Sequence, residues 1–161
     1  MIVILDKVIT EAQARYCIDK FKQELPVSDH LGKIIINNED NFQEDPYFVE
    51  IMSTIINSAY NLKPLIDSEW SELNYWPTLT SHSLHYDSAS KDTVFTSITY
   101  LNNNFRGGET FFEDGTVISP VVGRTVFFDG RKYKHGVRTV SHGTRFSLPV
   151  WYKTKDLFND I

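Results

Sequence analysis

Two segments in the first part of the chain repeat apolar residues at the spacing of an amphipathic helix. The first begins at Thr10, which forms a capping-box pattern with Gln13, and ends before Pro26. Its apolar positions are Ala14, Cys17, Ile18, Phe21 and Leu25. The second begins with Asp45 as N-cap and Pro46 in its first turn. Its apolar positions are Phe48, Ile51, Met52, Ile55, Ile56 and Ala59. The pattern therefore predicts two helices.

Between residues 68 and 153 the helical spacing gives way to alternation of apolar and polar residues, with frequent turn signals. The predicted strands are Val94 to Leu101, Glu109 to Phe112, Thr116 to Ile118, Arg124 to Phe128 and Thr144 to Tyr152. Turns are predicted at Asp114-Gly115 and Asp129-Gly130, and a short strand at Ile2 to Leu5 precedes the first helix. Many consecutive antiparallel strands favour a sandwich or a barrel. We expect one domain over residues 1–161, with a mainly helical support (1–66) against a β core (68–153).

Composition and charge narrow the classes of function. With 161 residues, 41% of them hydrophobic, the chain has enough apolar surface for one core. A net charge of -5 argues against binding to nucleic acid or to an acidic membrane, because both need a basic surface. A single cysteine, Cys17, allows no intrachain disulfide, and no stretch is apolar enough to span a membrane. We therefore expect a soluble, cytoplasmic protein.

Two histidines and one aspartate form a candidate metal site. On a strand, residues two apart point to the same face, so His85 and Asp87 of His85-Tyr86-Asp87 are expected to meet one ion. His135 lies downstream, at the start of another predicted strand, and completes the set. Two histidines and a carboxylate on one face of an octahedral iron leave positions open for a 2-oxo acid and dioxygen. His82 is a rival ligand, but alternation along the strand predicts that its side chain points away from His85.

Arg145 follows His135 by ten residues, on the next predicted strand. The planar guanidinium fork is suited to the distal carboxylate of a dicarboxylate. Arg138 is the competing arginine, and the spacing favours Arg145.

With these residues in place, the sequence from about Tyr75 to Tyr152 resembles the 2-oxoglutarate/Fe(II) oxygenase superfamily, in particular its prolyl 4-hydroxylase-like branch. The ordered motifs that carry the resemblance are His85-Tyr86-Asp87, Tyr100-Leu101, Gly107-Gly108-Glu109-Thr110-Phe111-Phe112, Gly123-Arg124-Thr125-Val126-Phe127-Phe128, His135-Gly136-Val137, Gly143-Thr144-Arg145 and Trp151. The implied fold is a mainly β double-stranded β-helix (jelly-roll or cupin-like), buttressed by about two N-terminal α-helices.

The resemblance also implies roles for single residues. His85, Asp87 and His135 are implied to bind Fe(II), and Arg145 is implied to bind the C5 carboxylate of 2-oxoglutarate. Tyr100 and Tyr75 match tyrosines of the co-substrate pocket, and Tyr86 and Trp151 are candidate substrate contacts. The implied reaction is hydroxylation of a C–H bond with O2 as further co-substrate, ascorbate as a candidate reductant, and succinate and CO2 as products. The favoured substrate is a prolyl residue in a peptide or protein.

The sequence departs from that branch at two places: the segment Ser88 to Asp92 is short, and Thr93 replaces an arginine. Alternatives therefore stay open. One is an oxygenase acting on a free amino acid or another small metabolite, and another is a barrel that binds a metal or ligand without catalysis. A zinc hydrolase would use the same three ligands. An oxygenase acting on nucleic acid is disfavoured by the acidic charge.

Overall fold

The computed structural model of the protein describes residues 1–24, 32–36, 40–87 and 90–156. Its helices are α1 (Glu11–Glu24), α2 (Asp40–Gln43) and α3 (Pro46–Leu62). Both predicted helix starts are confirmed. The Thr10 N–H donates to Gln13 Oε1 (2.9 Å) and the Gln13 N–H to Thr10 Oγ1 (3.1 Å), and the Phe48 N–H donates to the capping carboxylate of Asp45. The predicted end of the first helix, at Leu25 and Pro26, lies outside the described residues. None of the described helices is both long and apolar enough to cross a membrane.

A six-stranded sheet forms the larger layer of the molecule, in the order β1-β9-β5-β12-β3-β2. Its strands are β1 (Val3–Leu5), β2 (Gly32–Ile35), β3 (Ile66–Trp76), β5 (Thr93–Tyr100), β9 (Thr125–Phe128) and β12 (Arg145–Thr154). All neighbouring strands run antiparallel. Strand β2 lies within residues 1–66, the part of the chain that was expected to be mainly helical, and it completes this sheet at its edge. Four residues with one glycine give too short a pattern to be recognised as a strand.

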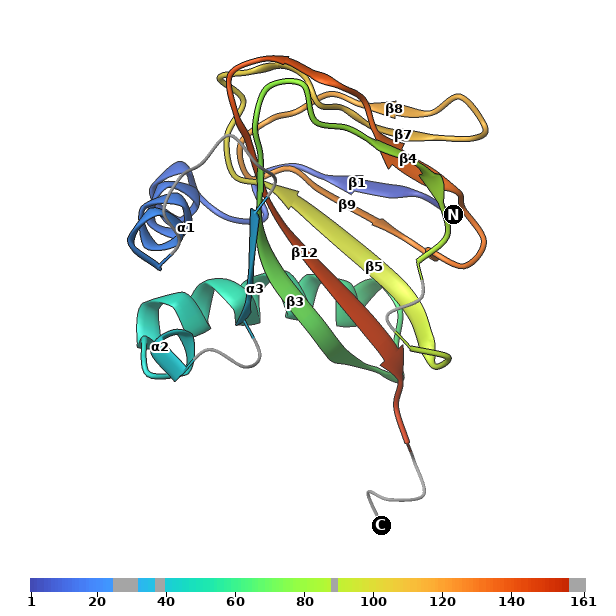
Figure 1. Cartoon of the computed structure of the whole chain (residues 1–161). Helices are drawn as coiled ribbons and strands as arrows, with labels where there is room; N and C mark the ends of the chain where they lie inside the picture. The colour runs from blue at the N-terminus through green and yellow to red at the C-terminus, as the bar shows by residue number, and fades with distance from the viewer. Residues whose placement is uncertain (25–31, 37–39, 88–89, 157–161) are drawn as a thin grey trace.

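A smaller layer faces this sheet (Figure 1). It consists of four strands in the order β4-β10-β7-β8 and of a separate pair, β11 with β6. The strands are β4 (His82–His85), β6 (Arg106–Gly107), β7 (Thr110–Phe112), β8 (Val117–Ile118), β10 (His135–Val137) and β11 (Val140–His142). The predicted turn at Asp114-Gly115 joins β7 to β8. Two facing antiparallel sheets of this kind form the expected double-stranded β-helix.

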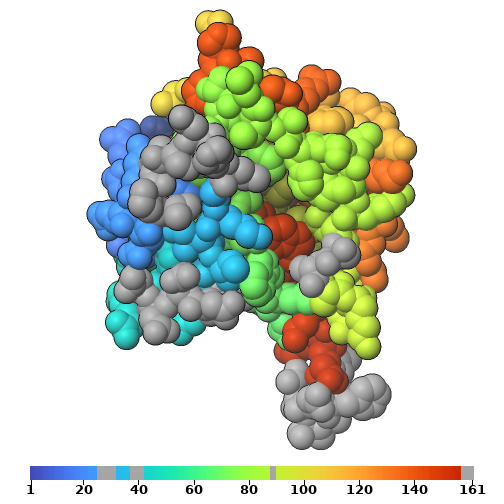
Figure 2. Space-filling view, in the orientation of Figure 1, coloured from blue at the N-terminus to red at the C-terminus, as the bar shows by residue number. Residues whose placement is uncertain are grey.

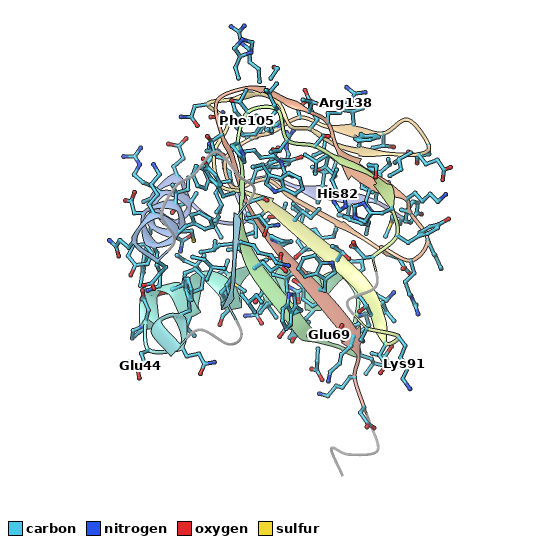
Figure 3. The ribbon with its side chains drawn as sticks, in the orientation of Figure 1. Glu44, Glu69, His82, Lys91, Phe105 and Arg138 are labelled. Carbon is cyan, nitrogen blue, oxygen red and sulfur yellow. The ribbon has the colours of Figure 1, made fainter. Side chains whose placement is uncertain are left out.

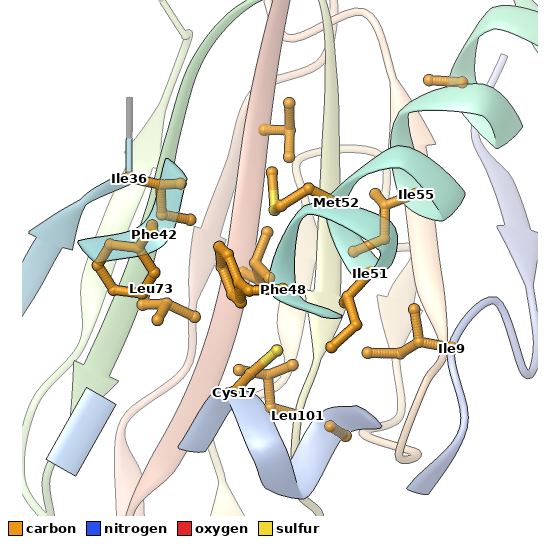
Figure 4. Close-up of a cluster of buried hydrophobic side chains, with 14 of the residues drawn as sticks. Ile9, Cys17, Ile36, Phe42, Phe48, Ile51, Met52, Ile55, Leu73 and Leu101 are labelled. Atoms are coloured by element: carbon orange, nitrogen blue, oxygen red, sulfur yellow. The ribbon is translucent and has the colours of Figure 1, made fainter. Parts of the chain in front are cut away.

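The helices cover the outer face of the large sheet (Figure 1), and most of the core lies between them. Cys17, Phe48 and Ile51 from the helices pack there with Leu73 of β3 (Figure 4). A second, smaller cluster lies between the two sheets: Ile98, Tyr100, Phe112, Ile118, Val126 and Phe128. The helices and this inner cluster hold the large sheet on both faces, and part of its inner face is left free to line a cavity.

Candidate functional site

A cavity of about 550 Å³ opens on the inner face of the large sheet. Alternating residues of two neighbouring strands form its wall: Trp70, Glu72, Asn74 and Trp76 from β3, and Arg145, Ser147, Pro149 and Trp151 from β12. In Figure 2 the surface is hollowed between β2 and the green residues of the β4 region, with red atoms of β12 at the bottom. Because side chains alternate along a strand, every second residue of β3 and β12 faces the cavity.

The structure brings the three predicted metal ligands together on the opposite wall. His85, Asp87 and His135 each offer one ligand atom, and these atoms lie within 4.8 Å of one another. The Asp87 Oδ1 atom is 3.2 Å from His135 Nε2 and 3.5 Å from His85 Nε2. His85 and His135 are register partners on β4 and β10, which explains how residues so distant in the sequence meet. Asp87 and His135 are buried, whereas His85 is half-buried.

Both imidazoles are held in the orientation that a metal ligand needs. His85 Nδ1 lies 2.8 Å from the Ser83 carbonyl oxygen, and His135 Nδ1 lies 2.9 Å from the Tyr133 carbonyl oxygen. A carbonyl only accepts, so each Nδ1 carries the proton when the ring is neutral. Each Nε2 is directed at Asp87 Oδ1 and the space between the three side chains, where it donates to the carboxylate when it carries a proton and offers its lone pair to an ion once that proton has left. Hydrogen bonds of this kind from the remote ring nitrogen are a regular feature of histidines that bind metals.

Asp87 lies just beyond the end of β4, so the prediction that it shares a strand with His85 is wrong. Its position is fixed otherwise: its N–H donates to the Gly130 carbonyl (2.8 Å), and its Oδ2 accepts from Thr96 Oγ1 (2.7 Å). Burial alone would raise the pKa of Asp87, but hydrogen bonds from His135 and His85 hold the pKa well below its usual value. The carboxylate is thus charged, with Oδ1 directed at the histidines.

The prediction that the His82 side chain points away from His85 is wrong. Its ring stacks on His85, with centroids 3.8 Å apart, although the two residues are three apart on one strand. The cause is an irregularity in the pairing of β4 with β10: His135 pairs with His85, but Val137 pairs with His82, so one extra residue sits on β4. An extra residue reverses the expected side of the strand. His82 therefore lies beside the cluster, on β4 (Figure 3).

Arg145 is the buried cation of the cavity. Its side chain is 1% exposed, and its donors reach the Gly108 carbonyl (2.9 Å), Ser147 Oγ (2.9 Å) and Thr110 Oγ1 (3.3 Å). All three acceptors are neutral, and burial lowers its pKa. No salt bridge is found for it among the described residues. A buried charge without a counter-charge is costly, so this site favours an anionic ligand.

The other predicted contacts differ in position. Tyr100 is buried beside Arg145, with its ring centre 5.1 Å from the guanidinium, but its hydroxyl donates to Thr110 Oγ1 and it does not line the cavity. The prediction for Tyr75 is contradicted: its ring packs between Phe21 and Phe146, toward the helices, because odd-numbered residues of β3 face outward at this end of the strand. Tyr86 and Trp151 both line the cavity, Tyr86 with 49% of its surface exposed.

Four residues of β3 that line the cavity were missed from the sequence. They are Trp70, Glu72, Asn74 and Trp76. Alternation along β3 was the available signal, but no strand was predicted over Ile66–Trp76, and so the inward face was not assigned. Part of the short segment Ser88 to Asp92 lies outside the described residues.

Comparison with known proteins adds to this geometry. Residues 73–153, half of the chain, match the family model described as 2OG-Fe(II) oxygenase superfamily. The chain belongs to the 2OG-Fe(II) oxygenase superfamily. The matched span of this oxygenase contains the three ligand candidates and Arg145.

Curated relatives of the oxygenase include prolyl 3-hydroxylase 2 of Rattus norvegicus, which is 31% identical over 74 residues (42% of this chain and 10% of that protein). Prolyl 3-hydroxylase 3 of Homo sapiens is 34% identical over 65 residues (36% of this chain and 9% of that protein). The alignments thus span about a tenth of the length of these relatives.

Solved structures with the same fold include a viral collagen prolyl hydroxylase from Paramecium Bursaria Chlorella virus-1, with a TM-score of 0.71, 17% identity and 96% of each chain covered. A prolyl hydroxylase from Trichoplax adhaerens, in complex with a peptide fragment of hypoxia inducible factor, has a TM-score of 0.75 and 16% identity, covering 95% of this chain and 83% of that one. At such identities the likeness concerns the fold, and it agrees with the double-stranded β-helix described above.

Proposed function

We propose that the protein is a 2-oxoglutarate-dependent Fe(II) oxygenase that hydroxylates a C–H bond. The observation that carries the proposal is a single cavity lined both by the His85, Asp87 and His135 cluster and by Arg145, a buried cation with no carboxylate partner among the described residues. A metal that binds a 2-oxo acid needs the first feature, and a co-substrate with a distal carboxylate needs the second. Family membership supports Fe(II), 2-oxoglutarate and O2 as the corresponding cofactor and co-substrates.

The three ligand candidates fit ferrous iron by their chemistry. Two imidazoles, each with Nε2 directed at the centre of the cluster, and one ionised carboxylate form a facial set with open positions. Thr96 holds the other oxygen of Asp87, which favours binding through Oδ1. Iron held there would supply the redox chemistry that activates dioxygen. The protein's own contribution is to fix the ligands, to orient the co-substrate through Arg145 and to exclude water from the deep end of the cavity.

The proposed reaction balances without a further reactant. Substrate C–H, O2 and 2-oxoglutarate give substrate C–OH, succinate and CO2, with one oxygen atom entering the substrate and the other entering succinate. The C1–C2 bond of 2-oxoglutarate breaks, and its oxidation balances the reduction of dioxygen. Ascorbate is proposed only as a reductant that keeps the iron ferrous, and its omission from the assay tests that role.

A prolyl residue in a peptide or protein is the proposed substrate. Trp70 and Trp151 are register partners and line the mouth of the cavity, beside Pro149. Aromatic faces of this kind pack well on a saturated ring such as that of proline. The curated relatives are prolyl hydroxylases, which supports the same choice.

The test is incubation with Fe(II), 2-oxoglutarate and O2, with proline-rich peptides and free L-proline compared as substrates. We expect mass spectrometry to show the gain of one oxygen in a peptide, with matching succinate release. The variant His135→Ala is the matched control and should abolish both. Oxygen gain only in a free amino acid would reject the peptidyl substrate, whereas turnover that persists in His135→Ala would reject the oxygenase site itself.

A further inference from the structure

Two polar atoms in the cavity wall have no hydrogen-bond partner. They are Trp76 Nε1 and Asn74 Oδ1, and they are the only buried side-chain nitrogen or oxygen atoms of this kind among the described residues. Both residues line the cavity, and Trp76 is 7% exposed. Buried polar groups in folded proteins nearly always have a hydrogen-bond partner. Two buried atoms without one in the same cavity therefore indicate a ligand that hydrogen-bonds to them.

The strand register places Trp76 beside Arg145. The two residues are direct partners on β3 and β12, and the guanidinium carbon lies 5.5 Å from the centre of the indole ring. On its other side the indole lies 6.1 Å from the His82 ring, which stacks on His85. Trp76 therefore spans the distance between the buried cation and the metal-ligand cluster. Asn74 pairs with Ser147, two residues along the two strands and on the same face of the sheet.

The chemistry of the Trp76 indole N–H limits which ligand groups it can bind. An indole N–H donates and does not accept, so its partner must be an acceptor. Next to a guanidinium that has no carboxylate partner among the described residues, the favoured acceptor is an anionic oxygen. Carboxylates commonly accept from several donors at once, and Arg145 and Trp76 offer such donors from adjacent strands.

We propose that the Trp76 indole N–H donates to the distal carboxylate of the co-substrate, beside Arg145, and so helps to position 2-oxoglutarate. This inference rests on the proposed function. It goes beyond it by assigning to Trp76 a contact that the family resemblance implied for Tyr100, in a pocket to which the resemblance also assigned Tyr75. The Tyr100 hydroxyl is already bonded to Thr110, and Tyr75 faces the helices. Asn74 would contact the same ligand. Its side-chain amide can accept a hydrogen bond through the oxygen or, with the amide flipped, donate one through the nitrogen.

The substitution Trp76→Phe keeps an aromatic ring beside Arg145 and removes only the N–H. With Zn(II) as a redox-inert metal, calorimetry should show the affinity for 2-oxoglutarate falling about tenfold, as for loss of a hydrogen bond to a charged group. The affinity for 2-oxopentanoate, which lacks the distal carboxylate, should not change. The matched control is Trp70→Phe, because the Trp70 N–H already donates to Glu72 (2.9 Å) at the mouth of the cavity.

A second measurement needs no folded variant at position 76. The chain has three tryptophans, so the wild-type protein labelled with ¹⁵N on its indoles gives three Nε1–H signals, which Trp70→Phe and Trp151→Phe assign. Adding 2-oxoglutarate and Zn(II) should move the Trp76 proton downfield, and 2-oxopentanoate should not. If wild-type protein binds 2-oxoglutarate while the Trp76 signal and the Trp76→Phe affinity stay unchanged, this inference is overturned and the proposed function stands. If wild-type protein binds no 2-oxoglutarate, the proposed function falls as well.

Discussion

At the scale of single residues, Arg145 is held by neutral acceptors alone. The Gly108 carbonyl and the hydroxyls of Ser147 and Thr110 fix the direction of the guanidinium without neutralising its charge. The large sheet thus holds a buried cation whose hydrogen bonds and ring contacts offset only part of its desolvation, and a bound anion would offset more. We therefore propose Arg145 as a binding residue, whose effect on ligand affinity should exceed its effect on the stability of the ligand-free protein.

We predict that Arg145→Ala lowers 2-oxoglutarate affinity by about 2–5 kcal/mol, the usual loss when one partner of a buried charge pair is removed. Isothermal titration in the presence of Zn(II) measures this directly, and metal affinity should stay nearly unchanged. Arg138→Ala is the control, since Arg138 is exposed and lies at the upper edge of the small sheet, away from His82 (Figure 3). A larger loss at Arg138 would show that the wrong arginine has been assigned.

Gly130 gives a second prediction at this scale. A Cβ atom at this position would lie 2.7 Å from Asp87 Oδ2 and 2.9 Å from Thr96 Oγ1, so Gly130→Ala must displace the carboxylate. We expect metal affinity to fall about tenfold, in line with other changes next to metal ligands. Gly115→Ala is the comparison, because that turn has no atom within 4 Å of the added methyl group and its positive φ affects stability alone. Equal metal affinity in wild type and Gly130→Ala would contradict the placement of Asp87.

The sequence predicted which residues form the site better than it predicted which way their side chains point. His85, Asp87 and His135 were recognised because their types and order are those of a facial ligand set, and the structure brings them together. The directions of Tyr75 and His82 were wrong, because each depends on a local register that residue types do not reveal. One extra residue in a strand moves the side chains beyond it to the opposite face of the sheet. The extra residue on β4 has this effect on His82.

At the scale of elements, helix α3 is fixed at its start by Asp45. This carboxylate caps the helix through the Phe48 N–H and also accepts from Lys20 (2.8 Å) and Tyr16 of α1, so it ties the two long helices together. Burial opposes ionisation, but the bonds from Lys20 and Tyr16 lower the pKa of Asp45 to about 2. The two start signals, the Thr10–Gln13 capping box and Asp45 before Pro46, are local in the sequence, which is why both helix starts were predicted correctly.

We predict that Asp45→Ala lowers the free energy of unfolding by about 1–2 kcal/mol at neutral pH, the usual cost of losing a cap. The folded-state pKa of about 2 lies below the value of about 3.9 for an unfolded aspartate. The charge therefore stabilises the fold fully above about pH 4, and this stabilisation is lost as pH falls toward 2. Urea unfolding at pH 7 and pH 2.5 measures the difference, with the exposed Asp19→Ala as control. A deficit that grows on acidification would contradict this account.

At the scale of the whole molecule, one buried core joins the helices to the large sheet. Cys17 is fully buried within it, and burial raises the pKa of its thiol to about 12. Strand β2 belongs to the same sheet although it lies between the two long helices in the sequence. Such long-range pairing depends on the edge that β3 offers, and so the sequence of β2 alone did not predict it.

The buried thiol allows a test of the single domain that we propose for residues 1–161. We predict that Cys17 reacts with a thiol reagent only on global unfolding, so the fraction labelled should follow the loss of circular dichroism across a urea titration. An unfolded chain supplies the control for full reactivity. Labelling at urea concentrations well below the dichroism transition would show that α1 detaches as a separate unit.

The central claim is that one cavity holds ferrous iron and 2-oxoglutarate together. Anaerobic titration of the protein with Fe(II) and 2-oxoglutarate, followed by visible absorption, tests it most directly. We predict the weak charge-transfer band of a chelated 2-oxo acid in the wild-type protein, and its loss in His85→Ala and in His135→Ala, because the cluster leaves adjacent positions open. A wild-type protein without the band, or a band that persists unchanged in both variants, would contradict the account.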